Sequence, residues 1–169
     1  EEQRQFTATL GTLARERTGE DVFTVSLDPE KSAGVEYLKG SLYWHFDGTM
    51  QEKPILSSIL CAKVLSSTGG NTEFACMRAA YDALPDDIKQ KLDGLVAEHS
   101  LVYSRSTVTT NALTSDMTAE LPGAWQTMVR VNPVNGRKAI FAGAHASHVI
   151  GWPREEGRAF INWLNEFAT

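Results

Sequence analysis

An imidazole and a carboxylate stand two residues apart in the stretch Trp44-His45-Phe46-Asp47. On a β-strand, side chains at positions i and i+2 point to the same face, so His45 and Asp47 could converge on one metal ion. One carboxylate and two histidines form the facial triad of non-haem Fe(II) oxygenases, which leaves coordination positions open. The spacing alone is weak, and it favours the simpler interpretation that the two side chains only hydrogen-bond each other.

The composition indicates one globular domain. The 169 residues include 42% hydrophobic and 9% aromatic residues, enough to form a core. No apolar run reaches the length of a membrane span and no signal peptide is visible, so we expect a cytoplasmic protein with no membrane partner. The net charge of −5 and the lack of a basic cluster argue against a nucleic-acid partner. Cys61 and Cys76 are expected to be buried free thiols.

Helices and strands alternate irregularly along the chain. Helical spacing of apolar residues, or Pro near a helix start, predicts helices over 2–14, 77–84, 86–95 and from Pro153 to the end. Apolar and β-branched runs predict strands over 22–27, 42–46, 54–65, 72–75 and 98–103, with a hairpin of 125–131 and 137–144 around Asn135-Gly136. The polar stretch 104–122 is expected to be a long loop, which could act as a lid. These elements indicate an α+β domain built on a β-sandwich or barrel.

Several further blocks occur in a fixed order along the chain. The Trp44–Met50 block is followed by Gly69-Gly70-Asn71-Thr72-Glu73-Phe74, by Arg78–Pro85, by Val129–Lys138 and by His145–Pro153. In order and spacing, these five blocks resemble the TauD/TfdA family of taurine/2,4-dichlorophenoxyacetate dioxygenases over nearly the whole chain. One block alone would say little, whereas five in order are specific.

The resemblance implies a double-stranded β-helix, or jelly roll, with flanking helices. It implies an enzyme that uses Fe(II), 2-oxoglutarate and O₂. By position, His45 and Asp47 match the first two iron ligands, and Thr72 matches the threonine that hydrogen-bonds the 2-oxoglutarate carboxylate. A hydroxyl suits that role because it can donate to an anionic oxygen.

The chain departs from the family pattern at both ends. The second iron-binding histidine and the arginine that pairs with 2-oxoglutarate are expected beyond Thr169, and the opening segment of the family is expected before Glu1. We therefore interpret residues 1–169 as a single dioxygenase-like domain that lacks its N-terminal segment and its C-terminal strands.

The other histidines and one arginine have simpler interpretations. His145 and His148 lie in a segment that does not bind iron in the family, so we expect one to pack inside the fold and the other to line the edge of the site. His99 is expected to be structural. Arg105 could bind an anionic substrate, although a solvated loop arginine is the simpler interpretation.

The resulting hypothesis is a dioxygenase that hydroxylates a small, anionic organic substrate and releases succinate and CO₂. Self-association is possible, because this family often forms homo-oligomers. Two alternatives remain open: a jelly-roll hydrolase or isomerase that uses Zn(II) or Mn(II) at the same pair, and a non-catalytic fragment that lacks the distal histidine. The glycine loop and Thr72 argue against the first alternative.

Overall fold

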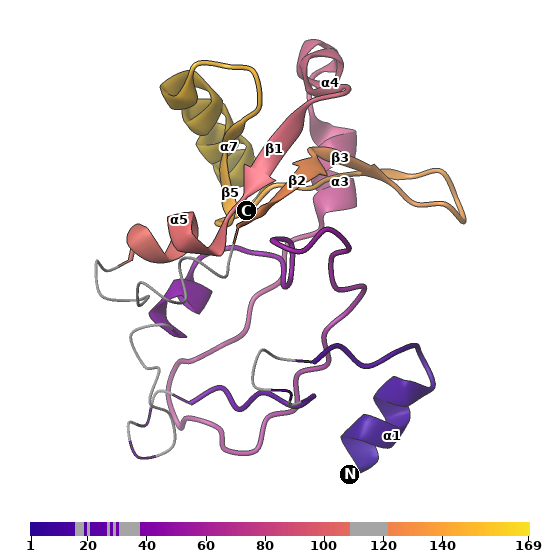
Figure 1. Cartoon of the computed structure of the whole chain (residues 1–169), viewed down its shortest axis with the longest axis vertical. Helices are drawn as coiled ribbons and strands as arrows, with labels where there is room; N and C mark the ends of the chain where they lie inside the picture. Colours follow the sequence, from indigo (N-terminus) through magenta and orange to yellow (C-terminus); the bar gives the residue numbers. More distant parts are fainter. Residues whose placement is uncertain (16–18, 20, 27, 29, 31–37, 109–121) are drawn as a thin grey trace.

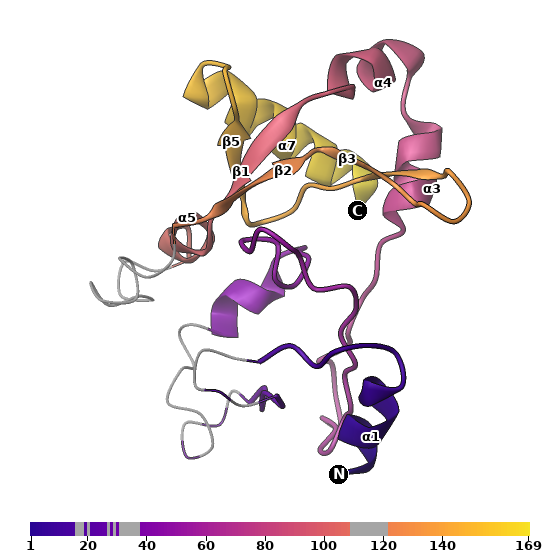
Figure 2. The same cartoon turned by 45° about the vertical axis from the view of Figure 1, so that its right-hand side comes forward.

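The computed structural model describes residues 1–169 except 16–18, 20, 27, 29, 31–37 and 109–121. The strands and most of the helices lie at one end of the molecule and come from Met77 onward (Figures 1 and 2). In the described residues before Met77, the regular elements are α1 (Glu2–Ala8) and the short 3₁₀ helix η1 (Lys39–Leu42). The rest of that half is extended chain and turns.

Two small antiparallel sheets form the folded end. The first has the order β2-β1-β5, with β1 (Val96–His99) between β2 (Ala124–Thr127) and β5 (Ala146–Val149). The second is the hairpin of β3 (Val129–Val131) and β4 (Lys138–Ile140), in which Arg130 pairs with Ala139. The predicted hairpin around Asn135-Gly136 is confirmed in a shorter form, and the start of its predicted first strand belongs to β2, which pairs with β1. Gly136 has the positive φ that its turn requires.

Among the described residues, four helices belong to this end. They are α3 (Met77–Ala83), α4 (Asp86–Leu92), α5 (Leu101–Ser106) and α7 (Arg154–Ala168). Pro85 and Pro153 stand immediately before α4 and α7, where proline costs no hydrogen bond, and acidic residues occupy the first turn of each helix. The predicted helices over 77–84 and 86–95 and after Pro153 are confirmed, and the first predicted helix is confirmed in a shorter form.

The hydrophobic core lies between the sheets, α3 and α7. Leu92, Met128, Ile140, Ile161 and Leu164 are its largest buried apolar side chains. Met128 joins the two sheets, because its N–H donates to the carbonyl of Leu95 and its own carbonyl accepts from Phe141. Helix α7 approaches β5 so closely that a Cβ built on Gly157 would lie 2.8 Å from the backbone nitrogen of Val149. Glycine is therefore required where α7 crosses the sheet.

Several strand predictions are wrong. The described residues of 22–27, and all of 42–46, 54–65 and 72–75, form no strand, and η1 occupies the start of the second segment. In the third segment Leu56 and Val64 are 92% and 87% exposed, so it is not buried either. An apolar, β-branched run becomes a strand only when a neighbouring strand satisfies its backbone groups. In the described structure these segments have no such partner.

The predicted 98–103 strand is partly correct, since β1 ends at His99 and α5 begins at Leu101. The predicted loop over 104–122 is also partly replaced by α5, and its residues 109–121 lie outside the described structure. The mixed α and β character is confirmed.

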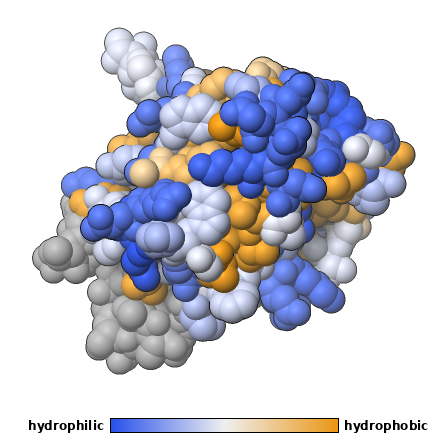
Figure 3. Space-filling view, turned by 90° about the horizontal axis from the view of Figure 1, so that it is seen from above, coloured by the Kyte–Doolittle hydropathy of each residue, from blue (hydrophilic) through white to orange (hydrophobic). Residues whose placement is uncertain are grey.

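The surface differs from expectation at the cysteines. Cys61 and Cys76 are free thiols, as predicted, but both are exposed rather than buried. Seen from the end that carries α4 and α7, the molecule is covered mostly by hydrophilic side chains, with hydrophobic ones visible between them (Figure 3). Of the described helices, none combines the length and apolar character needed to cross a membrane.

His99 is a buried polar residue in this apolar environment. Its side chain is 1% exposed and its ring stacks on Phe141 at a centroid distance of 5.5 Å. Neither ring nitrogen forms a hydrogen bond of ordinary geometry within the described residues. Burial, together with the positive charge of Arg130, lowers the pKa of His99 to about 4. The ring is therefore neutral at pH 7, and its expected structural role fits this position.

The neutral burial of His99 predicts a pH-dependent stability. The unfolded chain takes up a proton on this residue near its ordinary pKa of 6.5, whereas the folded chain does so only near 4. The contribution of His99 to the free energy of unfolding therefore decreases as the pH falls from about 6.5 to about 4, by up to about 3 kcal/mol in total. The measurement is the free energy of urea unfolding across that range, for the wild type and His99→Phe, which can keep the stacking. Equal pH slopes for the two proteins would contradict this account.

Candidate metal centre

His45 and Asp47 do approach each other, although no strand carries them. Both lie in the irregular stretch that follows η1, and their Nε2 and Oδ1 atoms are 3.4 Å apart. The two side chains are 26% and 52% exposed, so the pair faces an open side of the molecule. The predicted convergence of the two groups is therefore present, while the strand that was expected to produce it is absent.

The hydrogen bonds of His45 select one ring nitrogen for a ligand. Nδ1 lies 2.7 Å from the carbonyl oxygen of Tyr43. A carbonyl can only accept, so Nδ1 carries the proton and Nε2 keeps its lone pair when the ring is neutral. Metal-binding histidines usually have their second nitrogen held in this way. Two ligand atoms of one transition metal ion lie about 3 Å apart, since each is about 2.1 Å from the metal, and the observed 3.4 Å is close to that.

The carboxylate of Asp47 is also held from behind. Ser58 donates a 2.6 Å hydrogen bond to its Oδ2, while Oδ1 faces His45. The hydrogen bond from His45, and secondarily that from Ser58, lowers the pKa of Asp47 to about 2. The same pairing raises the pKa of His45. A neutral imidazole nitrogen and an ionised carboxylate oxygen, 3.4 Å apart, are donors that a divalent cation accepts, so the residues present fit a metal ion.

Backbone contacts fasten this segment to the folded end. Ala144 donates a 2.9 Å hydrogen bond to the carbonyl of Trp44. Beside it, a Cβ on Gly143 would lie 3.3 Å from the Cα of His45, so the two chains pass at close range. The ring of Phe46 packs on Phe141 at 4.9 Å. Trp44, in contrast, is 40% exposed rather than packed in a core.

Gln126 fixes the turn that follows the pair. This β2 residue is 3% exposed, and its amide nitrogen donates to the carbonyl oxygens of Thr49 and Gln51 at 3.0 and 2.7 Å. Arg130 donates to its amide oxygen. All the hydrogen-bonding groups of this amide face partners, so a single buried side chain joins the segment after Asp47 to the sheet. No sequence pattern marks this residue, because its partners are backbone atoms 75 and 77 residues away.

His145 lies directly behind His45. The two rings meet edge to face at a centroid distance of 5.8 Å, and His145 is 4% exposed. Its Nδ1 shares a 2.8 Å hydrogen bond with the hydroxyl of Ser104 in α5. Burial lowers the pKa of His145 to about 3, so the ring is neutral. His148 is partly exposed and pairs with Glu98 at 3.4 Å, so one histidine packs inside and the other does not.

Arg105 is buried rather than solvated. It belongs to α5, is 5% exposed, and its Nη1 would lie 1.6 Å from a Cβ built on Gly40. The expectation of a solvated loop arginine is therefore wrong. Its positive charge makes a minor contribution that lowers the pKa values of both His45 and His145. The structure thus places a cation close to the His45–Asp47 pair, which the sequence offered only as a possibility.

Thr72 is not brought to the pair by any described contact. It is exposed in the strandless stretch before α3, and its side chain forms no hydrogen bond within the described residues. Among all the residues that the structure describes, no group of three His, Cys, Asp or Glu side chains could hold a metal ion. His45 and Asp47 are two donors, and a third donor is not among the described residues.

Comparisons with known proteins show which family the chain resembles. The family model described as "Taurine catabolism dioxygenase TauD, TfdA family" matches residues 1–169. The alpha-ketoglutarate-dependent 2,4-dichlorophenoxyacetate dioxygenase of Burkholderia sp. (strain RASC) is 45% identical over 127 residues, which cover 75% of this chain and 42% of that protein. The (S)-phenoxypropionate/alpha-ketoglutarate-dioxygenase of Sphingobium herbicidovorans is 35% identical over 140 residues, covering 79% and 49%.

A solved structure is similar to the chain in three dimensions. The structure titled AAD-2 in complex with Mn(II) and N-oxalylglycine superposes with a TM-score of 0.78 at 39% identity, over 86% of this chain and 49% of that one. The chain thus spans about half the length of the relatives it matches.

The role of Gln126 predicts a large loss of stability on substitution. Gln126→Leu keeps the approximate volume of the side chain but leaves the carbonyls of Thr49 and Gln51 and the guanidinium of Arg130 without their partner. We expect the free energy of unfolding to fall by roughly 2–4 kcal/mol, measured by urea titration. Gln51→Ala is the matched control, since Gln51 takes part only through its backbone carbonyl. Similar losses in both variants would show that the amide has no special role.

Proposed function

This chain belongs to the taurine catabolism dioxygenase TauD, TfdA family, and from that membership we propose that it carries part of the active site of an Fe(II)- and 2-oxoglutarate-dependent dioxygenase. His45 and Asp47 are its first two metal ligands. Thr72 is the proposed hydrogen-bond donor to the 2-oxoglutarate carboxylate.

One observation carries the proposal. The two side chains that the family motif selects are 3.4 Å apart, and the hydrogen bond from Nδ1 to Tyr43 leaves Nε2 as the acceptor directed at that space. A pair that served only to stabilise a loop would not need a fixed tautomer and a second hydrogen bond on Asp47 from Ser58.

These residues supply orientation and charge. With Nδ1–H held by the Tyr43 carbonyl, His45 offers a neutral lone pair, and Asp47 offers a carboxylate that stays ionised because its pKa is about 2. A bound Fe(II), with 2-oxoglutarate and O₂, would supply the oxidation that hydroxylates the substrate and releases succinate and CO₂. Phe46 and Phe141 cover one side of the segment with apolar surface and limit the access of water from that side.

The proposed substrate is a small anionic organic molecule. The relatives named above act on dichlorophenoxyacetate and on phenoxypropionate, both carboxylates. The buried Arg105 places positive charge near His45, which favours an anion approaching the site.

The remaining parts of the site belong to the same proposal. A second histidine and a 2-oxoglutarate-binding arginine are expected beyond Thr169, and the two small sheets are expected to form part of a jelly roll. In this proposal residues 1–169 form a single dioxygenase-like domain that lacks its N-terminal segment and its C-terminal strands. The cytoplasmic location and the self-association expected from the sequence are also proposals.

Two alternatives make different predictions. A Zn(II) or Mn(II) hydrolase or isomerase would use the same pair without 2-oxoglutarate. A non-catalytic fragment would neither bind iron firmly nor turn over. Anaerobic addition of Fe(II) and 2-oxoglutarate to the full-length protein should give a weak visible charge-transfer band. Absence of that band would favour the hydrolase or isomerase, and succinate release from a polypeptide ending at Thr169 would exclude the inactive fragment.

Substitution of either proposed ligand should abolish the band. His45→Ala and Asp47→Asn each remove one of two described donors, so we expect at least a hundredfold loss of Fe(II) affinity and no succinate. Asp82→Asn is the matched control, because it makes the same chemical change at a surface ion pair with Arg137. Retention of the band in both ligand variants would refute the assignment of the pair.

Ser58 should affect metal binding without being a ligand. Ser58→Ala removes the 2.6 Å hydrogen bond to Asp47 Oδ2, so the carboxylate loses one of the two contacts that orient it. We expect Fe(II) affinity to fall about tenfold while the thermal midpoint changes little, because Ser58 is exposed. Ser57→Ala, one residue away and also exposed, is the control and should leave affinity unchanged. Equal affinities for the two variants would remove Ser58 from the site.

A further inference from the structure

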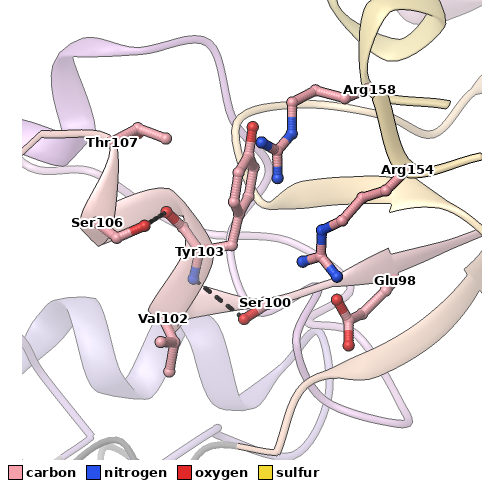
Figure 4. A pocket seen from close by; sticks show the side chains of 8 residues that line it. All are labelled: Glu98, Ser100, Val102, Tyr103, Ser106, Thr107, Arg154 and Arg158. Atoms are coloured by element: carbon pink, nitrogen blue, oxygen red, sulfur yellow. Dashed lines mark hydrogen bonds between the residues drawn. The ribbon is translucent and has the colours of Figure 1, made fainter. Parts of the chain in front are cut away.

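A hollow that includes neither residue of the His45–Asp47 pair is lined partly by α5. It has a volume of about 490 Å³ and is lined by residues of β1, α5 and α7. Figure 4 shows the side chains of Arg154 and Arg158 extending from α7 toward Tyr103 and Glu98. A volume of this size is in the range of small-molecule sites.

Helix α5 separates the two sites because its residues face in two directions. Ser104 is buried and contacts His145, which in turn packs on His45. Tyr103, the residue before it, lines the hollow instead. The hollow is therefore a separate site and does not depend on the proposed metal chemistry.

The two arginines present their charges on one face of α7. They are four residues apart, so they lie one turn apart on the same side of the helix. The guanidinium carbon of Arg158 lies 4.6 Å from the ring centroid of Tyr103, and its Nε donates to the carbonyl of Ser147 at 3.4 Å. These contacts hold the plane of Arg158 in place before any ligand arrives, which reduces the entropic cost of binding.

Arg154 is the more available of the two cations. It is exposed, and within the described residues its side chain forms no ion pair or hydrogen bond. An unpaired guanidinium one turn from another repels it, and an anion between them would relieve that repulsion. Bidentate contacts to oxyanions are the interactions for which this group is best shaped.

The one acidic side chain among the described lining residues, Glu98, already interacts with β5. Ser147 donates a 2.5 Å hydrogen bond to Glu98 Oε2, which also lies 3.4 Å from Nδ1 of His148. The carboxylate is therefore engaged with β5, and two cations face one anion across the hollow. Two further acidic residues, Glu155 and Glu156, lie in the first turn of α7, but they do not line the hollow.

One of the serine and threonine hydroxyl groups that line the hollow can donate a hydrogen bond to a ligand. Ser100 Oγ accepts a hydrogen bond from the backbone nitrogen of Tyr103, so its own proton remains available (Figure 4). The hydroxyls of Ser106 and Thr107 donate to backbone carbonyls and are used up. We propose that this hollow binds a small oxyanion, a carboxylate or a phosphate group, between Arg154 and Arg158, with Ser100 as an additional donor.

The test is a titration of the full-length, metal-free protein with inorganic phosphate and, separately, with acetate at constant ionic strength. Calorimetry gives affinity, and amide chemical shifts locate the site. We expect saturable binding with shifts in α5 and the start of α7, and at least a tenfold loss of affinity in Arg154→Gln and in Arg158→Gln. Arg158→Lys should also lose affinity, because it keeps the charge but not the stacked, forked donor. Response to phosphate alone or to acetate as well identifies which oxyanion the site accepts.

Arg137→Gln is the matched control, because it removes the same charge at a surface ion pair with Asp82. Its affinity should equal that of the wild type, and thermal midpoints should show that every variant is folded. A uniform loss in all the arginine variants would mean a general charge effect and would overturn the proposal. Failure of both anions to saturate, or shifts confined to other parts of the protein, would overturn it as well. The His45→Ala variant, titrated in the same way, should bind the anion as tightly as the wild type.

Discussion

The attachment of an irregular segment to a small folded sheet is the constraint on which the candidate site depends. His45 and Asp47 belong to no strand or helix, so nothing in their own stretch fixes their separation. Their position comes instead from the hydrogen bond between Ala144 and Trp44 and from the amide of Gln126 beyond the pair. Ordinary secondary structure would have supplied such restraint locally. Here the backbone groups of the segment are satisfied by residues about 75 to 100 positions further along the chain.

One neutral and one charged side chain lie near the pair. His145 packs against His45 and is kept neutral by burial, while the guanidinium of Arg105 is buried nearby. A neutral ring behind His45 adds no positive charge beside it, whereas the guanidinium of Arg105 makes a minor contribution that lowers the pKa values of both histidines. Each of these side chains is held by α5, either directly or through Ser104. A helix of six residues therefore organises much of the electrostatics of the site.

Helix α5 contributes residues both to the surroundings of the His45–Asp47 pair and to the arginine-lined hollow. Leu101, Ser104 and Arg105 are its buried residues, and Tyr103 lies on the side where Arg158 stacks. The metal pair and the arginine-lined hollow consequently share one scaffold without sharing a residue. Since α7 packs on β5 through the close approach at Gly157, the arginines at its start are fixed relative to β1 and α5. Both sites thus depend on the three-stranded sheet being intact.

Local signals in the sequence were sufficient for α3, α4, α7 and the hairpin turn, but not for α5, which was expected to be strand and loop. Pro85 and Pro153 mark helix starts, the periodicity before Thr169 indicates α7, and Asn135-Gly136 specifies a turn, because each of these effects acts within a few residues. The motif around His45 and Asp47 likewise identified the pair, and the family with it. The strands expected over 54–65 and 72–75 could not be judged in this way, since a strand exists only if a partner pairs with it.

The tertiary structure alone decided the rest. The support of Asp47 by Ser58, the bond from Gln126 to the turn, and the burial of Arg105 join residues far apart in the chain or depend on packing. No periodicity or spacing records such contacts, because they arise when elements meet in space. The sequence determined which side chains are candidate metal ligands, and the fold determined how they are oriented and what charge surrounds them.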